Sequence, residues 1–284
     1  MIYQEDFKGY YDGVFAAIEA ICRPQLGDRQ AKISNEVVVT GIGCELFFPA
    51  FHYKGLIPVL VDVNLDSFLP GLDVIENCIV EGKTKAVLFP FPMGNTVNME
   101  QLRDICDEYN VFLIEFTLGE TVSGLGDLSV FRNKDGLTVQ VRSNPILANS
   151  IGFSKQTLET KQGNRKVSRD YLLSELLPHK QYFRFQQTVS IPDWYGFAIT
   201  VKETSPFDRT ELAQHLKENG IYTKLIESAT LLLQPSYKNI KHVVFQDLVN
   251  SDVIMRDTLY IPLRQNKKEE YIVKTIKEFV ESRT

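Results

Sequence analysis

The chain has 284 residues, of which 44% are hydrophobic, and this is enough for a sizeable core in one large or two smaller domains. Its 31 basic and 36 acidic residues give a formal charge of −5, which argues against a protein built to bind nucleic acid or a membrane surface. No apolar run approaches the roughly 18–20 residues that span a bilayer, and the acidic N-terminus lacks the apolar stretch of a signal peptide, so we expect a cytoplasmic protein.

In the first half of the chain, strands alternate with helices. Apolar and β-branched runs predict strands at 36–40, 56–63, 86–91 and 112–115. Apolar residues at helical spacing predict helices at 14–22, 73–80 and 98–109. This alternation implies right-handed crossovers and a mostly parallel sheet, as in an α/β fold.

The pattern changes in the second half. Helices are predicted at 167–177, 208–219 and 268–281, with Asp208 or Thr210 as the N-cap of the second helix and Gly220 as its stop. Strands are predicted at 183–189, 194–201, 221–226 and 257–262. We expect a large domain at 1–160 and a smaller α+β domain at 166–284, separated by the polar residues 160–164.

Several motifs that could carry chemistry have a simpler structural interpretation. Gly41-Ile42-Gly43 follows a predicted strand, but the third glycine of a dinucleotide loop would fall at Leu46 and no helix start is evident, which favours a tight turn. No histidine lies at ligand spacing and no G-x-S-x-G motif occurs. The cysteines are far apart and predict reduced, mostly buried thiols rather than disulfides or a metal site: Cys22, Cys44, Cys78 and Cys106.

Three charged residues remain open to two interpretations. Asp62 ends a predicted strand and Asp66 lies in the following loop, where functional residues often occur, but capping of a turn explains them equally well. Lys134 lies in Asn133-Lys134-Asp135-Gly136, a sequence typical of a hairpin turn with a solvated lysine. We favour the turn over a catalytic lysine.

Two stretches carry a resemblance to a known family. The first includes 35–40, 57–63, 83–86, 94–95, 102–106, 112–115 and 126–129. The second includes Trp-Tyr-Gly-Phe at 194–197, Gln-Pro-Ser-Tyr at 234–237 and Met-Arg-Asp-Thr at 255–258, together with 206–209, 216–221 and 247–248. Together they resemble the DegT-type sugar aminotransferases, which depend on pyridoxal phosphate (PLP), with the nucleotide-sugar 3-dehydrases, such as the CDP-4-keto-6-deoxyglucose 3-dehydrase, as the most similar branch.

The resemblance implies a fold-type-I aminotransferase architecture: a mostly parallel sheet with helices, a smaller α+β C-terminal domain, and a dimer with sites at the subunit interface. It also aligns four cofactor positions with unsuitable residues. The phosphate loop falls near Asp12, the residue that stacks on the cofactor near Cys44, and the aspartate of the pyridine nitrogen at Phe116. The catalytic lysine or histidine falls at Gly136 or Leu137, neither of which forms a Schiff base or moves a proton.

On the substrate side, the resemblance aligns an arginine before the nucleotide-sugar loop with Lys224, which keeps the charge but loses bidentate geometry. An asparagine and an arginine in the loop align with Thr230 and Leu233. The chain has no cysteine after Cys106, which excludes the iron–sulfur cluster that some relatives carry between their domains.

We therefore expect no bound PLP and a catalytically inactive homologue. It would form a homodimer, or a heterodimer with an active paralogue, in deoxysugar biosynthesis such as that of the lipopolysaccharide O-antigen. The alternatives are an enzyme that acts on a nucleotide sugar without PLP, through groups such as Lys224, Lys134 or Asp127, or a sensor that binds the sugar without turnover. An active PLP-dependent dehydrase or aminotransferase is the remaining possibility.

Overall fold

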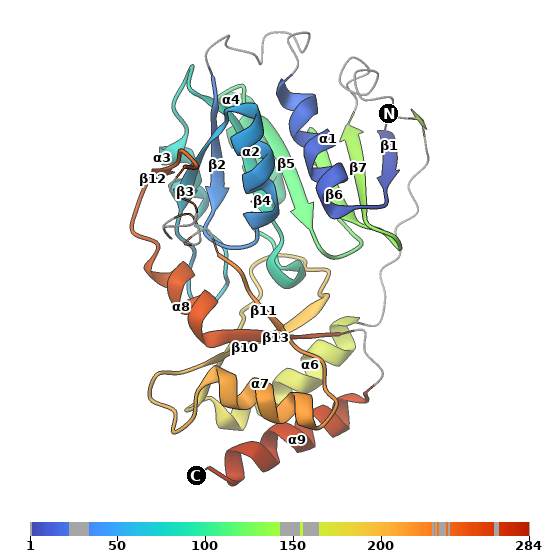
Figure 1. The fold of residues 1–284 in the computed structure, drawn as a ribbon, viewed down its shortest axis with the longest axis vertical. Coiled ribbons are helices and arrows are strands. Elements are labelled where there is room, and N and C mark those ends of the chain that lie inside the picture. Colours follow the sequence, from blue (N-terminus) through green and yellow to red (C-terminus); the bar gives the residue numbers. More distant parts are fainter. Residues whose placement is uncertain are drawn as a thin grey trace.

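The computed structural model describes residues 2–22, 34–142, 154–155, 165–228, 230, 232, 237, 239–263 and 267–283. Within these residues the chain forms two sheets, each with helices packed against it. The larger sheet occupies the upper part of Figure 1 and the smaller sheet the lower part. No helix in this part of the chain is long and apolar enough to cross a membrane.

The larger sheet has the strand order β12-β3-β2-β4-β5-β6-β7-β1-β8. Pairing is parallel from β12 through β6, whereas β7, β1 and β8 run antiparallel to their neighbours. Every residue of β4 and β5 is buried, as expected where helices cover both faces of a parallel sheet. The predicted α/β fold with a mostly parallel sheet is therefore confirmed. The strands are β1 (Ile2–Phe7), β2 (Glu36–Thr40), β3 (Ile57–Val61), β4 (Thr84–Pro90), β5 (Phe112–Thr117), β6 (Leu128–Arg132), β7 (Leu137–Arg142), β8 (Ser154–Lys155) and β12 (Val243–Val244).

Four helices cover the two faces of this sheet. Helices α1 (Tyr10–Cys22) and α2 (Phe48–Lys54) share one hydrophobic cluster with the strands and lie side by side in Figure 1. Helices α3 (Leu72–Cys78) and α4 (Met99–Glu108) share another. Asn98 caps α4 by accepting hydrogen bonds from the backbone of Glu100 and Gln101. Short 3₁₀ turns occur at Glu45–Phe47 and Pro92–Gly94.

The smaller sheet is antiparallel, with the order β11-β13-β10-β9. Its strands are β9 (Phe183–Phe185), β10 (Gly196–Val201), β11 (Lys224–Leu225) and β13 (Thr258–Pro262). Helices α6 (Arg165–Leu176), α7 (Arg209–Glu218) and α9 (Glu269–Glu281) pack on it in a separate hydrophobic cluster. A 3₁₀ turn at Leu177–His179 follows α6, and Asp208 forms a capping box with Glu211 on α7, as the sequence predicts.

Asp62 ties helix α8 (Val249–Asp257) to the larger sheet. Its buried carboxylate follows β3 and accepts hydrogen bonds from the backbone of Asn250 at 2.9 Å, and from the backbone and hydroxyl of Ser251 at 2.8 and 2.5 Å. These groups lie in the first turn of α8, where backbone N–H groups lack helical partners. Asp62 is thus a structural residue, but the expected capping of a local turn is wrong, because the carboxylate caps a helix far away in the sequence.

The Gly41-Ile42-Gly43 segment bends at the end of β2, with a φ of 84° at Gly43 and a Cβ on Gly41 excluded by the Ser251 hydroxyl, in line with the tight turn that the sequence favours. The expectation that no helix begins after it is wrong, since the 3₁₀ turn starts at Glu45 and continues into α2. The sequence also left β1, the strands β6 and β7, and α8 without prediction, and it extended β9 past Phe185. Gln186 leaves the strand because its buried amide donates to the carbonyls of Ser67 and Pro92.

The predicted division into domains stays a prediction, because the boundary at 160–164 lies outside the described residues. The C-terminal half is not confined to the smaller sheet, since β12 pairs in parallel with β3 at the edge of the larger one. The cysteine prediction is confirmed: all four are free thiols, and three of them are buried.

Replacing Asp62 by alanine should lower the free energy of unfolding by about 2–3 kcal/mol, because the first turn of α8 loses its cap and buried donors are left unpaired. Urea denaturation followed by circular dichroism measures the loss. Asp66→Ala is the matched control, since Asp66 pairs with Arg184 where both side chains are substantially exposed. Equal effects of the two substitutions would contradict the proposed role of Asp62.

Candidate functional site

Two neighbouring cavities lie where the parallel strands β2, β4 and β5 end. The small cavity has a volume of about 210 Å³ and is lined by residues that follow these strands, and by residues of the smaller sheet. The large cavity has a volume of about 500 Å³. The two cavities adjoin, because five residues line both of them: Leu46, Leu118, Tyr195, Lys224 and Tyr260. The carboxyl ends of parallel strands are the usual place for a ligand in an α/β fold, so this is the candidate site.

Phe116 forms part of the wall of the small cavity. Its side chain is 3% exposed, and its ring packs edge-on against the ring of Phe47 at a centroid distance of 5.1 Å. A phenyl ring offers neither a charge nor a hydrogen bond to a pyridine nitrogen. Phe116, which the resemblance aligns with the family's aspartate, thus lies at the cavity but cannot pair with a pyridine nitrogen.

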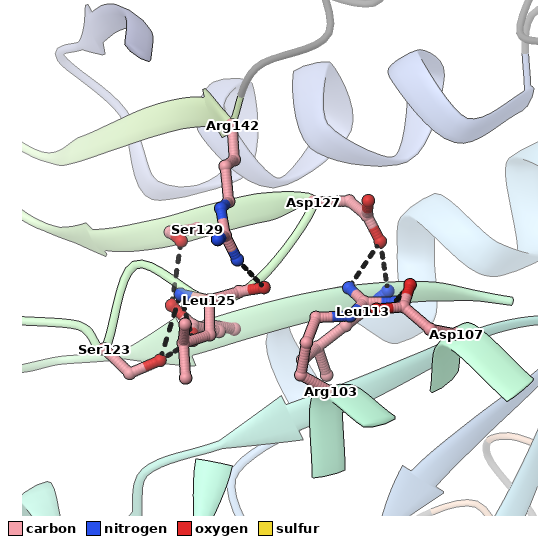
Figure 2. Close-up of polar contacts among 9 residues, drawn as sticks. Arg103, Asp107, Leu113, Ser123, Leu125, Asp127, Ser129 and Arg142 are labelled. Atoms are coloured by element: carbon pink, nitrogen blue, oxygen red, sulfur yellow. Dashed lines mark hydrogen bonds and ion pairs between the residues drawn. The ribbon is translucent and has the colours of Figure 1, made fainter. Parts of the chain in front are cut away.

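Glu115 does not replace the missing carboxylate. Successive side chains of a strand point to opposite faces, so Glu115 lies on the face of β5 away from Phe116. Its fully buried carboxylate accepts hydrogen bonds from the hydroxyls of Ser123 and Ser129 and from the backbone of Gly124 and Leu125. Figure 2 shows Ser123, Leu125 and Ser129 gathered in this network. Glu115 therefore holds the loop after β5 and is not available to a ligand in the cavity.

Asp127, a candidate for chemistry without PLP, lies close to this network but makes contacts of its own. Its carboxylate accepts hydrogen bonds from Arg103 and from the backbone of Leu113, both at 2.9 Å (Figure 2). Arg103 also pairs with Asp107 at 2.8 Å. Asp127 lines neither cavity, and its contacts are those of a structural residue that fixes α4 against β5.

The positions aligned with the catalytic base do not reach the cavities. Gly136 lies in the β6–β7 hairpin, where an added Cβ would lie 2.2 Å from the carbonyl oxygen of Phe7. Leu137 is fully buried in the core of the larger sheet. Lys134 is exposed in the hairpin turn, and the Asn133 side chain accepts from the backbone of Asp135 and Gly136. The turn interpretation of Lys134 is therefore confirmed.

The two remaining cofactor positions are also unsuited to PLP. Asp12 is exposed in the first turn of α1, where its negative charge would repel a phosphate. Cys44 is completely buried, and its thiol donates to the carbonyl oxygen of Thr40 at 3.0 Å. Burial raises the pKa of Cys44 well above its ordinary value, so the thiol stays neutral. The residues at these positions do not fit PLP.

Of the residues predicted to bind the substrate, one lines the cavities and another does not. Lys224 lines both cavities from strand β11 and is exposed, so it can meet an anion there. Thr230 is buried and bonds to the Ser228 hydroxyl, and it lines neither cavity. Leu233 lies outside the described residues. Asp66 also lies away from the two cavities, in an ion pair with Arg184.

Several residues that line the large cavity were not predicted from the sequence. Arg132 and Arg165 bring positive charge to the large cavity, where Arg165 donates to both oxygens of Asp193 at 2.9 Å. Tyr10, Tyr195, Tyr222 and Tyr260 add aromatic rings. Burial raises the pKa of Tyr260 to about 12, so its hydroxyl remains protonated. The large cavity thus combines cations with aromatic rings.

Glu45 is one of the two carboxylates that line the small cavity, the other being Glu227. Its Oε2 is shielded from solvent and has no hydrogen-bond partner among the described residues. Burial raises the pKa of Glu45 to about 8, and the charge of Glu227 adds to the rise, although nearby backbone hydrogen bonds oppose it. The only sequence signal is that Glu45 follows the glycine turn at the end of β2. In the described part of the chain, no group of three or more side chains could hold a metal ion.

Sequence comparison finds the chain similar to a family of sugar aminotransferases and dehydratases. Residues 26–121 and 150–280 match the DegT/DnrJ/EryC1/StrS aminotransferase family. The lipopolysaccharide biosynthesis protein RfbH of Salmonella typhimurium is 28% identical, over 93% of this chain and 78% of that protein. The GDP-4-keto-6-deoxy-D-mannose 3-dehydratase of Yersinia pseudotuberculosis is also 28% identical, over 85% of this chain and 78% of that protein. The unmatched residues 122–149 include the β6–β7 hairpin with Gly136.

Solved structures show the same fold. A GDP-4-keto-6-deoxymannose-3-dehydratase with bound GDP-perosamine superposes with a TM-score of 0.79 at 15% identity, covering 99% of this chain and 87% of that chain. The aminotransferase TlmJ from Streptoalloteichus hindustanus superposes with a TM-score of 0.77 at 16% identity, covering 100% and 86%. The expected fold-type-I aminotransferase fold is therefore confirmed, whereas the dimer with sites at the subunit interface stays a prediction.

Proposed function

This chain belongs to the DegT/DnrJ/EryC1/StrS aminotransferase family, and we propose that it is a catalytically inactive member that serves an active nucleotide-sugar 3-dehydratase or aminotransferase as a partner or regulatory subunit. The observation that carries the proposal is the site around the end of β5. Phe116 forms the cavity wall, and backbone fills the space that a side chain at Gly136 would need. Neither the ring partner nor the base of a PLP enzyme is present at these positions.

The relatives indicate the biosynthetic pathway in which such a subunit would act. One is named for lipopolysaccharide biosynthesis and others for the dehydration of nucleotide-linked deoxysugars. The fold is retained over nearly the whole chain, whereas residues 1–25 and 122–149, which hold Asp12 and Gly136, lie outside the family match. Retained architecture with altered cofactor segments favours a role in deoxysugar biosynthesis that depends on surfaces rather than on PLP chemistry.

An exposed aromatic face on α1 and α2 supports a partner. Tyr11 and Tyr53 are 54% and 73% exposed, and the Tyr53 ring packs edge-on against Phe15 at 5.8 Å. The two helices lie on the same side of the larger sheet (Figure 1). Clustered exposed aromatic rings are typical of protein–protein contacts, and this α1–α2 face (Tyr11, Phe15 and Tyr53) would be covered by the second subunit.

Mixing the chain with an active nucleotide-sugar 3-dehydratase or aminotransferase from the same organism should give a heteromeric complex, measured by size-exclusion chromatography with light scattering. Tyr53→Glu should weaken the complex at least about tenfold, because it places a charge in the apolar contact. Val167→Glu on α6 is the control, since Val167 is 71% exposed and lies away from this face. Absence of any complex, or equal effects of the two substitutions, would count against the partner role.

A second function, binding of a nucleotide sugar, is favoured by the large cavity. Arg132 and Lys224 present positive charge there, beside the Arg165–Asp193 ion pair, and the tyrosines present rings on which a base can stack. A diphosphate next to a nucleoside matches this combination. Binding without PLP chemistry is compatible with a regulatory subunit that reports the presence of a pathway sugar.

Isothermal titration with the cytidine, guanosine and thymidine diphosphate sugars should detect binding of at least one nucleotide class. Arg132→Ala and Lys224→Ala should each weaken it about tenfold, since each removes a charge-assisted contact to the diphosphate. Lys134→Ala removes an exposed cation outside the cavities and should leave the affinity unchanged. If no sugar nucleotide binds, the second function is wrong, while the partner role stands on its own test.

A further inference from the structure

The two cavities differ in the sign of their charges. The large cavity is lined by the cations Arg132 and Lys224, by Arg165, which is already paired with Asp193, and by the carboxylate of Glu120. The small cavity gathers two carboxylates, Glu45 and Glu227, and has Lys224 only where it meets the large one. A ligand that fills both cavities therefore meets cations at one end and carboxylates at the other, which suits a molecule with an anionic part and a cationic part.

Glu45 brings an unpaired oxygen to the small cavity. Its Oε2 is closed from solvent and lacks a hydrogen-bond partner among the described residues. The carboxylate accepts hydrogen bonds from the nearby backbone, but an oxygen that is closed from solvent and has no partner is costly and calls for an explanation such as a ligand. A cation entering the small cavity would supply the missing donor and would favour the ionised carboxylate.

The walls of the small cavity select the kind of cation. The rings of Phe116, Tyr195 and Tyr260 line it, and aromatic rings attract an organic cation through their faces. A metal ion prefers a set of several oxygen, nitrogen or sulfur ligands, and no such set of three occurs in the described part of the chain. Two carboxylates among aromatic and apolar side chains are instead suited to a primary ammonium group.

We propose that the small cavity binds the ammonium group of an amino sugar, with Glu45 as its counter-ion, while the nucleoside diphosphate of the same molecule lies in the large cavity. This inference rests on the proposed binding of a nucleotide sugar and names its class. The regulatory subunit would then respond to the product of an amination, which is an amino sugar, and not to the keto or hydroxy sugar that precedes it. Glu45 would distinguish the two by charge.

The ionisation of Glu45 predicts how binding depends on pH. In the free protein the raised pKa of about 8 leaves Glu45 mostly protonated at neutral pH, and an ammonium group needs the ionised form. Affinity should therefore fall as the pH decreases below about 8, by up to about tenfold per pH unit. The other titratable groups around the cavity are Glu227, Lys224, Tyr195 and Tyr260, of which both tyrosines have a pKa raised by burial.

The test is isothermal titration of the full chain at about pH 6, 7 and 8 with GDP-perosamine and its N-acetylated form, and with the corresponding cytidine and thymidine diphosphate pairs. Acetylation keeps the nucleotide and the ring but removes the positive charge. We expect the free amine to bind at least about tenfold more tightly than the acetylated form at pH 8, with the advantage shrinking towards pH 6.

Glu45→Gln keeps the size of the side chain and should abolish both the preference for the amine and its pH dependence, while the acetylated sugars still bind. Glu81→Gln, an exposed carboxylate away from the cavities, should leave the preference intact. Equal binding of amine and acetylated form, or a preference that survives Glu45→Gln, would overturn the inference and leave the nucleotide-sugar proposal standing. If no member of the panel binds, both are wrong.

Discussion

The alternation of side chains at the end of β5 is the constraint on which the site depends. Because neighbouring residues of a strand point to opposite faces, the chain commits Glu115 to one side of the sheet and Phe116 to the other. Glu115 is held by four donors from the loop that follows β5 and from β6. A shift of one residue in register would bury Phe116 among these donors and leave the carboxylate against Phe47, so the pairing of β5 with β4 and β6 fixes which group faces the cavity.

With Phe116 facing the cavity, the negative charge of the site lies elsewhere. The carboxylates of the site are Glu227 after β11 and Glu45 at the end of β2, whose raised pKa of about 8 leaves it mostly protonated at neutral pH until a cation binds. The cations lie in the adjoining large cavity, on residues of the β6–β7 hairpin, α6 and β11. The smaller sheet supplies part of both cavities, and the Asp62–α8 contact is one of the links that hold the C-terminal half against the larger sheet. Fold stability and the shape of the site therefore depend on the same contacts.

The sequence predicted the central strands and the helices between them because these are long apolar runs with clear periodicity, as in β4 and β5. It missed α8 because the residue that caps it, Asp62, is 188 residues away from Asn250, and no local pattern records such a contact. Strand β1 was missed because its polar residues read as a loop, although Glu5 and Asp6 pair along β7. Glu45 was missed for a related reason: its unusual environment comes from β11 and β13, which only the folded chain brings to the end of β2.

The central claim is that this member of the family works without PLP, and an absorbance spectrum tests it most directly. The purified protein would be incubated with PLP, and the spectrum recorded before and after borohydride. The account predicts no visible Schiff-base band, no bleaching and no rise in melting temperature, since neither Gly136 nor Leu137 can react with the aldehyde. A visible band that borohydride removes would contradict the claim, provided that the reduced PLP stays attached to a lysine and that substituting this lysine abolishes the band. The chain would then be an active PLP enzyme.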